Sequence, residues 1–351
     1  MANKIIGIFG GGQLGKMSCE AAHKLGFKTA IFCPEKNSIA SEIADKSFCA
    51  DYLDKKSLDE FLNYIDIASL EFENIPTKTI EYSSSKIPTF PKANILKITQ
   101  DRLLEKGFLR KNNIEVADFM EIKSIDNLKN SLKSFNNKAI LKTATMGYDG
   151  KGQYVLNKDS NLEQIMAENI KNSLILEKFI PFDQEISVII ARNEKGEISC
   201  YDPLTNIHKN SILDESIYPA RISKDVKVKS QEIAHKISEK LDLTGILAIE
   251  FFVLDNGKLL VNEMAPRPHN SGHFSMDGAK TSQFEQFIRA ISGLDFTDNK
   301  FIKTGKMKNL IGEDINNTQI YQSNSNAKIH IYGKKEVKTG RKMGHVNILD
   351  N

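Results

Sequence analysis

Two glutamates, Glu250 and Glu263, interrupt apolar segments on either side of Asn256-Gly257. This dipeptide is a strong signal for a two-residue β-turn, which would place Glu250 directly opposite Glu263. Opposed side chains have Cβ atoms about 5 Å apart, so two carboxylates there repel unless a cation lies between them. With the adjacent Asn262, the pair predicts a Mg²⁺ site of hard oxygen ligands serving nucleotide phosphates. The alternative is an exposed acidic pair at the rim of a sheet.

A glycine-rich loop between two strand-like segments suggests a second part of the same site. Gly147, Gly150 and Gly152 lie within six residues. Glycines let the backbone approach a ligand closely and turn N–H groups toward an anion, and Lys142 and Lys151 add positive charge. This pattern is typical of a loop that closes over phosphates, although a solvated hairpin tip would have the same composition.

A proline-stiffened loop at residues 264–273 begins directly after Glu263. Its Arg267 and His269 would suit a small anion or a carbonyl oxygen, and its prolines limit the entropy lost in holding them. A lone histidine is usually structural, but the position of this loop beside the acidic pair favours a functional role.

Glu71 and Glu73 follow an apolar run at residues 65–70. If the strand continues, both side chains face the same way at the carboxyl edge of an α/β sheet, where ligand crevices form. Two acids there would bind an amine. The alternative is a pair of solvated loop acids before Pro76.

The elements that would position these residues begin with a β-α-β unit over residues 4–33. Its turn carries the glycines of a dinucleotide-binding fingerprint (Gly10, Gly12, Gly15), and Glu35 has the spacing of a ribose contact. An NAD-dependent dehydrogenase is therefore a rival hypothesis. Pro34 before Glu35 and the absence of a long six-stranded repeat weaken it.

The remaining pattern predicts a mixed α/β and α+β chain. A small unit with strand, helix, strand, glycine loop, strand, helix and strand is expected to act as a lid on a larger antiparallel sheet. Helices are expected at residues 98–112, 230–241 and 283–292. The predicted parts are an N-terminal α/β domain (1–97), a linking helix (98–113), a lid (114–180), a metal and nucleotide subdomain (181–298) and a C-terminal β-rich piece (299–351).

Composition limits the class of protein. The 351 residues are 40% hydrophobic and 26% charged, and no apolar run approaches the roughly 20 residues that span a bilayer. No signal-peptide pattern is present at the N-terminus, so a cytoplasmic protein without membrane contact is expected. A net charge of +3 and the lack of tryptophan argue against nucleic-acid binding. Four well-separated cysteines argue against a zinc site or a disulfide framework: Cys19, Cys33, Cys49 and Cys200.

Taken in order, these motifs resemble the ATP-grasp superfamily and, within it, the 5-(carboxyamino)imidazole ribonucleotide synthase family of purine biosynthesis. The resemblance runs over essentially the whole chain, and the Pro-His-Asn loop is its most specific part. The motifs that carry it are residues 10–17, 71–73, 147–153, 262–273 and 332–334.

This resemblance implies the ATP-dependent carboxylation of 5-aminoimidazole ribonucleotide by bicarbonate through carboxyphosphate, with release of ADP and phosphate. It implies the cofactors ATP and Mg²⁺ and a homodimer. Another ATP-grasp carboxylate–amine ligase of purine metabolism is the nearest alternative, because it would share the nucleotide site and differ in the amine and the acid.

The resemblance also implies roles for individual residues. The residues implied to bind the ATP phosphates are Arg102, Lys142, Gly147, Tyr148, Asp149, Gly150, Lys151, Gly152 and Gln153. Those implied to contact adenine are Glu177, Lys178, Phe179 and Ile180. Glu185 is implied to bind the ribose, and His208 to lie in the surroundings of the nucleotide. For Mg²⁺ it implies Glu250, Asn262 and Glu263, and for the imidazole ribonucleotide Gln13, Leu14, Glu73, Tyr148, Asp149, Lys334, Arg341 and Lys342. The expected catalytic residues are Asp149, Lys151, Lys334 and, near bicarbonate, Arg267, His269 and Asn270.

Overall fold

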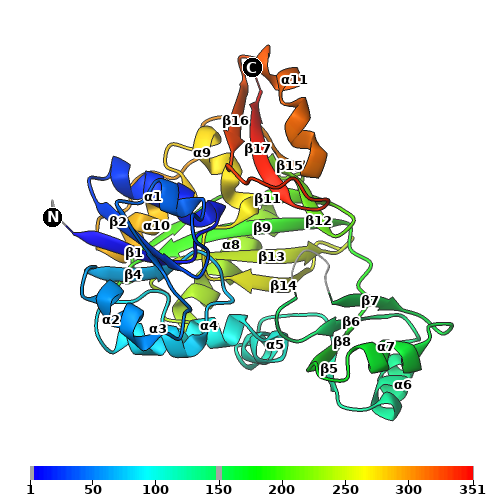
Figure 1. Ribbon diagram of the computed structural model, residues 1–351. Helices are drawn as coiled ribbons and strands as arrows, with labels where there is room; N and C mark the ends of the chain where they lie inside the picture. The colour runs from blue at the N-terminus through cyan, green and yellow to red at the C-terminus, as the bar shows by residue number, and fades with distance from the viewer. Residues whose placement is uncertain (1–3, 148–151, 351) are drawn as a thin grey trace.

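The computed structural model describes residues 4–147 and 152–350 and is built on three sheets (Figure 1). The N-terminal sheet is parallel, with the strand order β3-β2-β1-β4. Its strands are β1 (Ile5–Phe9), β2 (Lys28–Cys33), β3 (Lys46–Cys49) and β4 (Ile67–Leu70). The helices around it are α1 (Gln13–Lys24), α2 (Lys55–Leu62), α3 (Thr77–Ser84) and α4 (Ala93–Thr99), with a short 3₁₀ turn η1 (Ala40–Glu42). The predicted β-α-β unit is thus confirmed.

The single linking helix expected over residues 98–112 is wrong. The chain instead forms α4 and a separate helix α5 (Arg102–Lys111). The break occurs because Asp101 caps α5, its carboxylate accepting hydrogen bonds from the N–H groups of Leu103 (2.8 Å) and Leu104 (3.2 Å). The N–H of Arg102 donates to the carbonyl of Ala144 at 2.9 Å, which ties the start of α5 to the next unit.

That next unit is the predicted lid, and its order of elements is confirmed. Its elements are β5 (Phe119–Ile122), α6 (Ile125–Ser134), β6 (Ala139–Thr143), β7 (Gln153–Leu156), α7 (Leu162–Glu168) and β8 (Leu174–Lys178). The strands form an antiparallel sheet in the order β5-β8-β6-β7, with its own apolar core beneath α6 and α7. In Figure 1 the lid stands to one side of the remaining chain, joined to it through α5.

The third sheet has nine strands and includes the C-terminal piece. Its order is β14-β13-β9-β11-β12-β15-β17-β16, with β10 beside β9. The strands are β9 (Gln184–Arg192), β10 (Ile198–Cys200), β11 (Leu204–Lys209), β12 (Ile212–Tyr218), β13 (Gly245–Val253), β14 (Leu259–Ala265), β15 (Gly305–Ile311), β16 (Ala327–Ile331) and β17 (Lys342–Leu349). The C-terminal strands therefore extend the large sheet through the β12–β15 pairing.

Helices and short turns connect and cover this sheet. They are α8 (Lys224–Lys240), η2 (Asn270–Phe274), α9 (Ser275–Gly278), α10 (Gln283–Ser292), η3 (Gly312–Asn317) and α11 (Gln319–Gln322). The helix at 283–292 is confirmed, whereas α8 begins six residues before the expected 230 because Ser223 caps it. None of the helices within 4–147 and 152–350 is both long and apolar enough to cross a membrane. All four cysteines are free thiols.

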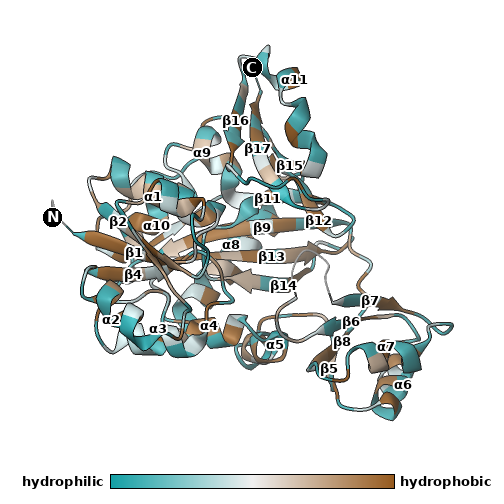
Figure 2. Cartoon of the chain, viewed as in Figure 1, coloured by the Kyte–Doolittle hydropathy of each residue, from teal (hydrophilic) through white to brown (hydrophobic). Residues whose placement is uncertain are grey.

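Helix α10 fixes the N-terminal domain against the large sheet. Its side chains Phe284, Phe287, Ile288 and Ile291 are almost fully buried and belong to one core with residues of α1 and β13. Strands β1 and β9 are largely brown, that is hydrophobic, in Figure 2. One continuous apolar core therefore holds two of the three sheets in a fixed relation.

The glycine turn between β1 and α1 wraps around an internal carboxylate. The two oxygens of buried Glu71 accept hydrogen bonds from the N–H of Gly12 and, at 2.8 Å, from the N–H of Gly15. A Cβ atom added to Gly12 would lie only 2.5 Å from Glu71 Oε1. In a dinucleotide-binding fold the pyrophosphate occupies this helix N-terminus. The fingerprint glycines here accommodate a side chain of the protein instead.

Glu71 and Glu73 do not face the same way, so that expectation is wrong. Strand β4 ends at Leu70 and the chain then turns, which sends Glu71 to the glycine turn and Glu73 to Arg267. The period-two alternation on which the expectation rested applies only while the strand continues.

Removing the carboxylate should destabilise the N-terminal domain. We expect Glu71→Ala to lower the free energy of opening of β1 and α1 by about 2–4 kcal/mol, because each buried N–H left without an acceptor costs about 1–3 kcal/mol. Hydrogen exchange of the amides in these two elements measures this quantity. Glu35→Ala, at the exposed ribose position of the fingerprint, is the matched control and should change nothing. Equal exchange in the two variants would contradict a structural role for Glu71.

Candidate active site

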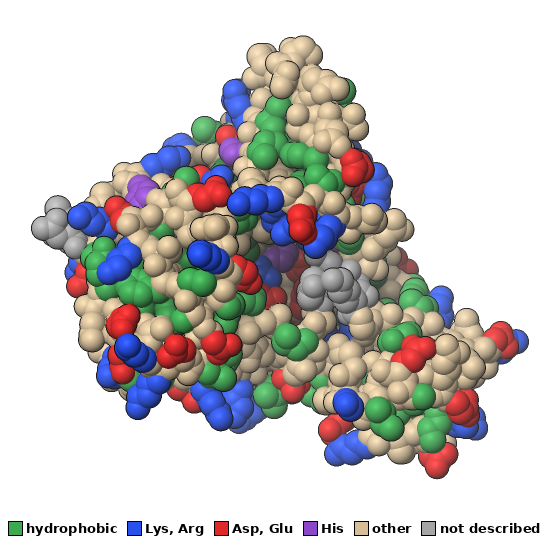
Figure 3. Space-filling model, viewed as in Figure 1, with side chains coloured by type: hydrophobic (Ala, Val, Ile, Leu, Met, Phe, Trp, Pro, Cys, Tyr) green, Lys and Arg blue, Asp and Glu red, His purple; other side chains and the backbone are tan. Residues whose placement is uncertain are grey.

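A cavity of about 840 Å³ lies between the N-terminal domain, the start of the lid, the β13–β14 hairpin and the C-terminal strands. The space-filling view is hollowed here, with histidine and acidic side chains inside and lysine and arginine side chains along the rim (Figure 3). The predicted residues that line it are Gln13, Leu14, Glu73, Arg102, Gly147, Glu263, Arg267, His269, Asn270, Lys334, Arg341 and Lys342. Tyr148, Asp149, Gly150 and Lys151 lie outside the described residues.

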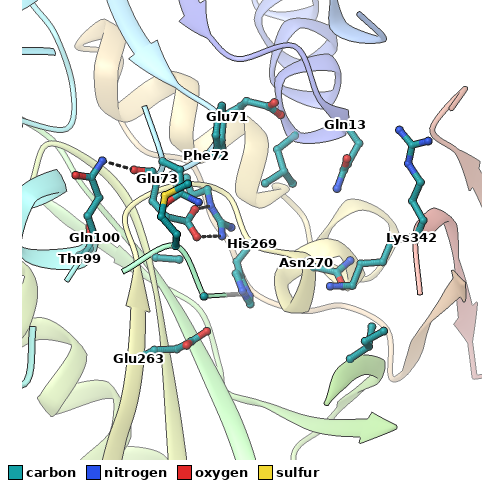
Figure 4. A pocket seen from close by; sticks show the side chains of 18 of the residues that line it. Gln13, Glu71, Phe72, Glu73, Thr99, Gln100, Glu263, His269, Asn270 and Lys342 are labelled. Carbon is teal, nitrogen blue, oxygen red and sulfur yellow. Dashed lines mark hydrogen bonds and ion pairs between the residues drawn. The ribbon is translucent and has the colours of Figure 1, made fainter. Parts of the chain in front are cut away.

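An ion pair between Glu73 and Arg267 forms one wall of the cavity (Figure 4). Two guanidinium nitrogens of Arg267 contact the two oxygens of the Glu73 carboxylate, one of them at 2.9 Å. Burial alone would raise the pKa of Glu73, but Arg267 lowers it to about 2. The side-chain amide of Gln100 donates to the Glu73 carbonyl at 2.6 Å. Glu73 is therefore a fixed anion that aims the arginine.

His269 lies beside this pair as a neutral imidazole. Burial, reinforced by the charge of Arg267, lowers the pKa of His269 to about 3. Its Nδ1 lies 2.8 Å from the hydroxyl of Ser271, and its Nε2 lies 3.8 Å from Glu250 Oε1. Nδ1 accepts the N–H of Ser271 at 3.3 Å, so the neutral ring carries its proton on Nε2. A guanidinium and an imidazole donor side by side can bind a small oxyanion.

The neighbouring Asn270 is held by a partner that the sequence did not suggest. The side-chain amides of Asn270 and Asn309 bond to each other in both directions, at 3.0 and 2.6 Å. Asn309 lies on β15 of the C-terminal piece, so this amide pair joins the loop after β14 to the far part of the sheet. Only the fold brings two residues so distant in sequence together.

The predicted pairing of Glu250 with Glu263 is confirmed, although the turn that suggested it is wrong. The turn has three residues, 255–257, because the Leu254 N–H bonds the Lys258 carbonyl and Gly257 takes a positive φ of 75°. That turn shifts the register by one residue and places Phe251 opposite Val261. A β-bulge at Asn262 shifts it back, so that the two glutamates face each other.

The two carboxylates of the hairpin have opposite environments. Burial and the charge of Glu263 raise the pKa of Glu250, while Arg102, whose guanidinium lies 3.1 Å from Glu263, offsets burial and lowers the pKa of Glu263. The buried Oδ1 of Asn262 has no hydrogen-bond partner among the described residues. Hard oxygen donors with a charge deficit and an unused lone pair fit a divalent cation.

This donor set is too small to enclose a metal ion by itself. Among the described residues no three His, Cys, Asp or Glu side chains gather closely enough to hold one. Magnesium commonly takes one or two carboxylates and completes its shell with water and substrate phosphates. The hairpin therefore fits a Mg²⁺ that arrives with a nucleotide, and it does not fit a permanent structural metal.

A buried cluster of charges lies behind the hairpin. Lys142 Nζ contacts Glu177 Oε2 at 2.8 Å, and both side chains are almost fully buried. Burial lowers the pKa of Lys142, whereas Lys106 and Lys142 overcome burial and lower the pKa of Glu177 to about 2. The side chain of Glu177 is thus a structural counterion, and any contact with adenine falls to its backbone.

The sequence analysis missed two members of this cluster, Glu105 and Lys106 of α5. Burial raises the pKa of Glu105 to about 8. The signal was present in the sequence, because Arg102, Glu105 and Lys106 recur at spacings of three and four residues and so share one helix face.

The other predicted nucleotide residues surround the charged cluster without lining the cavity. Glu185 on β9 contacts His208 on β11, and this carboxylate raises the pKa of His208 despite burial. Lys178 points outward, 3.9 Å from Asp118, so only its backbone is suited to adenine. The remaining predicted positions are Gly152, Gln153, Phe179 and Ile180, at the base of the glycine loop and after β8.

The C-terminal piece contributes a basic rim. Lys334 Nζ donates to the Lys342 carbonyl at 2.6 Å, and Arg341 donates to the Glu336 carbonyl at 3.0 Å. These bonds hold the segment between β16 and β17 over the cavity mouth. Three cationic side chains at one mouth suit a phosphate group.

Family models match three consecutive parts of the chain. A ribonucleotide synthetase preATP-grasp domain matches residues 3–100, an ATP-grasp domain matches residues 107–284, and a phosphoribosylaminoimidazole carboxylase C-terminal domain matches residues 306–351. The first match covers the N-terminal sheet, the second covers the lid and strands β9–β14 of the large sheet, and the third covers the C-terminal strands of the large sheet.

Curated relatives and solved structures match almost the whole chain. The N5-carboxyaminoimidazole ribonucleotide synthases of Bacillus subtilis and Brucella melitensis are each 40% identical, over 98% and 97% of this chain and 91% and 95% of their own. An ADP complex of an N5-carboxyaminoimidazole ribonucleotide synthetase is 39% identical with a TM-score of 0.95, covering 99% of this chain and 92% of its own.

An Aspergillus clavatus synthase in complex with ADP and 5-aminoimidazole ribonucleotide is 27% identical with a TM-score of 0.93, covering 99% of this chain and 94% of its own. Sequence identity, domain order and fold all agree over nearly the full length. The chain belongs to the N5-carboxyaminoimidazole ribonucleotide synthase family of ATP-grasp ligases.

Proposed function

We propose that this chain catalyses the ATP- and bicarbonate-dependent carboxylation of the amine of 5-aminoimidazole ribonucleotide, releasing ADP and phosphate. The observation that carries the proposal is the composition of a single cavity. It combines Glu263 of the acidic hairpin, suited to metal–nucleotide, with an arginine–histidine pair suited to a small oxyanion and a basic rim suited to a ribonucleotide phosphate. Three different substrates would thus meet in one space.

In the first step the γ-phosphoryl group of ATP is transferred to bicarbonate, because bicarbonate itself is a poor electrophile. Mg²⁺, held by Glu250, Asn262 and Glu263, would neutralise phosphate charge when bound. Arg102 adds a fixed cation beside Glu263. Arg267, aimed by Glu73, and the imidazole of His269 are suited to hold the bicarbonate oxyanion.

In the second step the amine attacks carboxyphosphate, or the CO₂ formed from it. The C–N bond forms, inorganic phosphate leaves, and the amine loses a proton. Asp149, on the segment outside the described residues, is the candidate to accept that proton. The imidazole of His269 is a poor base because its pKa is low and its Nδ1 already accepts the N–H of Ser271, so it is suited to donating a hydrogen bond from Nε2. A lid that excludes water would protect the labile intermediate.

The resemblance to the family also supports a homodimer in the cytoplasm, with Gln13, Leu14, Lys334, Arg341 and Lys342 around the ribonucleotide. Lys142 would reach the ATP phosphates by exchanging its bond to Glu177 for bonds to phosphate oxygens, and Lys106, 3.4 Å from Glu177 Oε1, would remain as the counterion of that carboxylate.

Omitting substrates one at a time tests the proposal. ADP release should be fastest with 5-aminoimidazole ribonucleotide, bicarbonate, ATP and Mg²⁺ together. Leaving out any one of them should slow it by about tenfold or more, which corresponds to over about 1.4 kcal/mol in the activation free energy. Stimulation by another amine or by formate in place of bicarbonate would favour a different ATP-grasp ligase. Reduction of NAD with no need for ATP would favour the dehydrogenase.

Neutralising the hairpin acids tests the metal role. Glu250→Gln and Glu263→Gln should each lower kcat/KM by about 100-fold and raise the Mg²⁺ concentration needed for half-maximal rate, because a metal ligand is lost. The matched control is Glu115→Gln, an exposed acid paired with Lys258 near the same hairpin. A large fall in thermal stability with activity retained would show that the hairpin acids are structural.

A further inference from the structure

Helix α5 contacts the end of strand β14 from one side. Arg102, Glu105 and Lys106 lie on one face of α5, and each contacts a different group of residues 262–264. Arg102 binds the carboxylate of Glu263 at 3.1 Å. One helix therefore contacts both the side chain and the backbone of the segment that carries the acidic hairpin.

The two backbone contacts bracket Glu263. Lys106 Nζ donates to the carbonyl of Asn262 at 3.2 Å, immediately before Glu263. Glu105 Oε1 accepts from the N–H of Met264 at 2.6 Å, immediately after it. With both flanking peptide groups held, rotation of the backbone at Glu263 is restricted, and so is the direction of its side chain.

Such restraint matters here because Asn262 is the bulge residue. A bulge leaves one residue outside the ladder and so removes the strand pairing that would otherwise orient it. The Oδ1 of Asn262 is buried without a partner among the described residues, so the side chain itself supplies no anchor. The bond from Lys106 takes the place of the missing ladder contact.

Lys106 also links this segment to the lid. Its ammonium lies 3.4 Å from Glu177 Oε1 on β8, and only 1% of its side chain is exposed. Burying an ammonium group is costly unless it is paired. A leucine or methionine would fill the same space without the free-energy cost of burying a charge. Packing alone therefore does not account for a lysine at this position.

We propose that Lys106 and Glu105 are positioning residues for Asn262 and Glu263, fixing the bulge in the conformation that accepts metal–nucleotide and, through Glu177, joining it to the lid. This inference rests on the proposed metal role of the hairpin. Lys106 lies outside the cavity lining and Glu105 borders it, and both residues hold the backbone of β14.

Binding of Mn²⁺ in the presence of ADP tests the inference without any turnover. Free Mn²⁺ is counted by its electron paramagnetic resonance signal as the protein is titrated. Lys106→Met should weaken Mn²⁺ binding by about tenfold or more, the range found when an outer partner of a metal ligand is removed. Lys106→Arg, which keeps a buried cation and donor, should restore part of the affinity. Lys111→Met, an exposed change on the same helix, is the control and should bind as wild type does.

Glu105→Ala provides an independent variant if Lys106→Met does not fold. It removes only the acceptor for Met264 and leaves the buried cations in place, and it should weaken Mn²⁺ binding several-fold. A lower thermal midpoint with unchanged Mn²⁺ affinity in a folded variant would overturn the inference, since that is the signature of a purely structural role.

The same titration separates this inference from the proposed function. Wild-type protein that binds Mn²⁺ with ADP but is not stimulated by 5-aminoimidazole ribonucleotide would overturn the substrate assignment and leave the positioning role standing. Wild-type protein that binds no Mn²⁺ with ADP would overturn both the metal role of the hairpin and the positioning role.

Discussion

The candidate site depends on the electrostatic repulsion between two carboxylates, Glu250 and Glu263, which face each other across the β13–β14 hairpin. Like charges at that separation destabilise a fold, and nearby groups offset only part of the repulsion. Arg102 stabilises the carboxylate of Glu263, whereas the pKa of Glu250 stays raised. The proposed Mg²⁺ site would make use of this repulsion, because a cation held between the two carboxylates would remove it.

Much of the site could be predicted because its residues are close in sequence. The acidic hairpin and the loop that follows it span residues 250–273, and local rules placed them together. The pairing of Glu250 with Glu263 was reached through a turn that is wrong, and a bulge at Asn262 compensated for the error. Bulges have no reliable sequence signal, so the agreement owed something to chance.

What could not be predicted depends on contacts between distant segments. The carboxylate of Glu71, 56 residues from Gly15 in sequence, accepts hydrogen bonds from the glycine turn. The glycines that resemble a cofactor fingerprint therefore bind a side chain of the protein. The sequence shows that Glu105 and Lys106 share a helix face with Arg102, but their burial follows from the packing of α5 against β14. Fold class and order of elements follow from periodicity, whereas the partner of a buried charge is decided by tertiary packing.

One hydrogen-bonded sheet carries both the acidic hairpin at β13–β14 and the basic segment between β16 and β17. A hydrogen-bonded sheet resists stretching within its own plane, so the sheet itself sets the distance between these two segments. The lid has a separate sheet and is connected to the large one at two places, through α5 before β5 and through residues 179–183 between β8 and β9. A movement of the lid would therefore leave that distance unchanged, and in the proposed reaction the spacing between nucleotide and acceptor would be set when the chain folds.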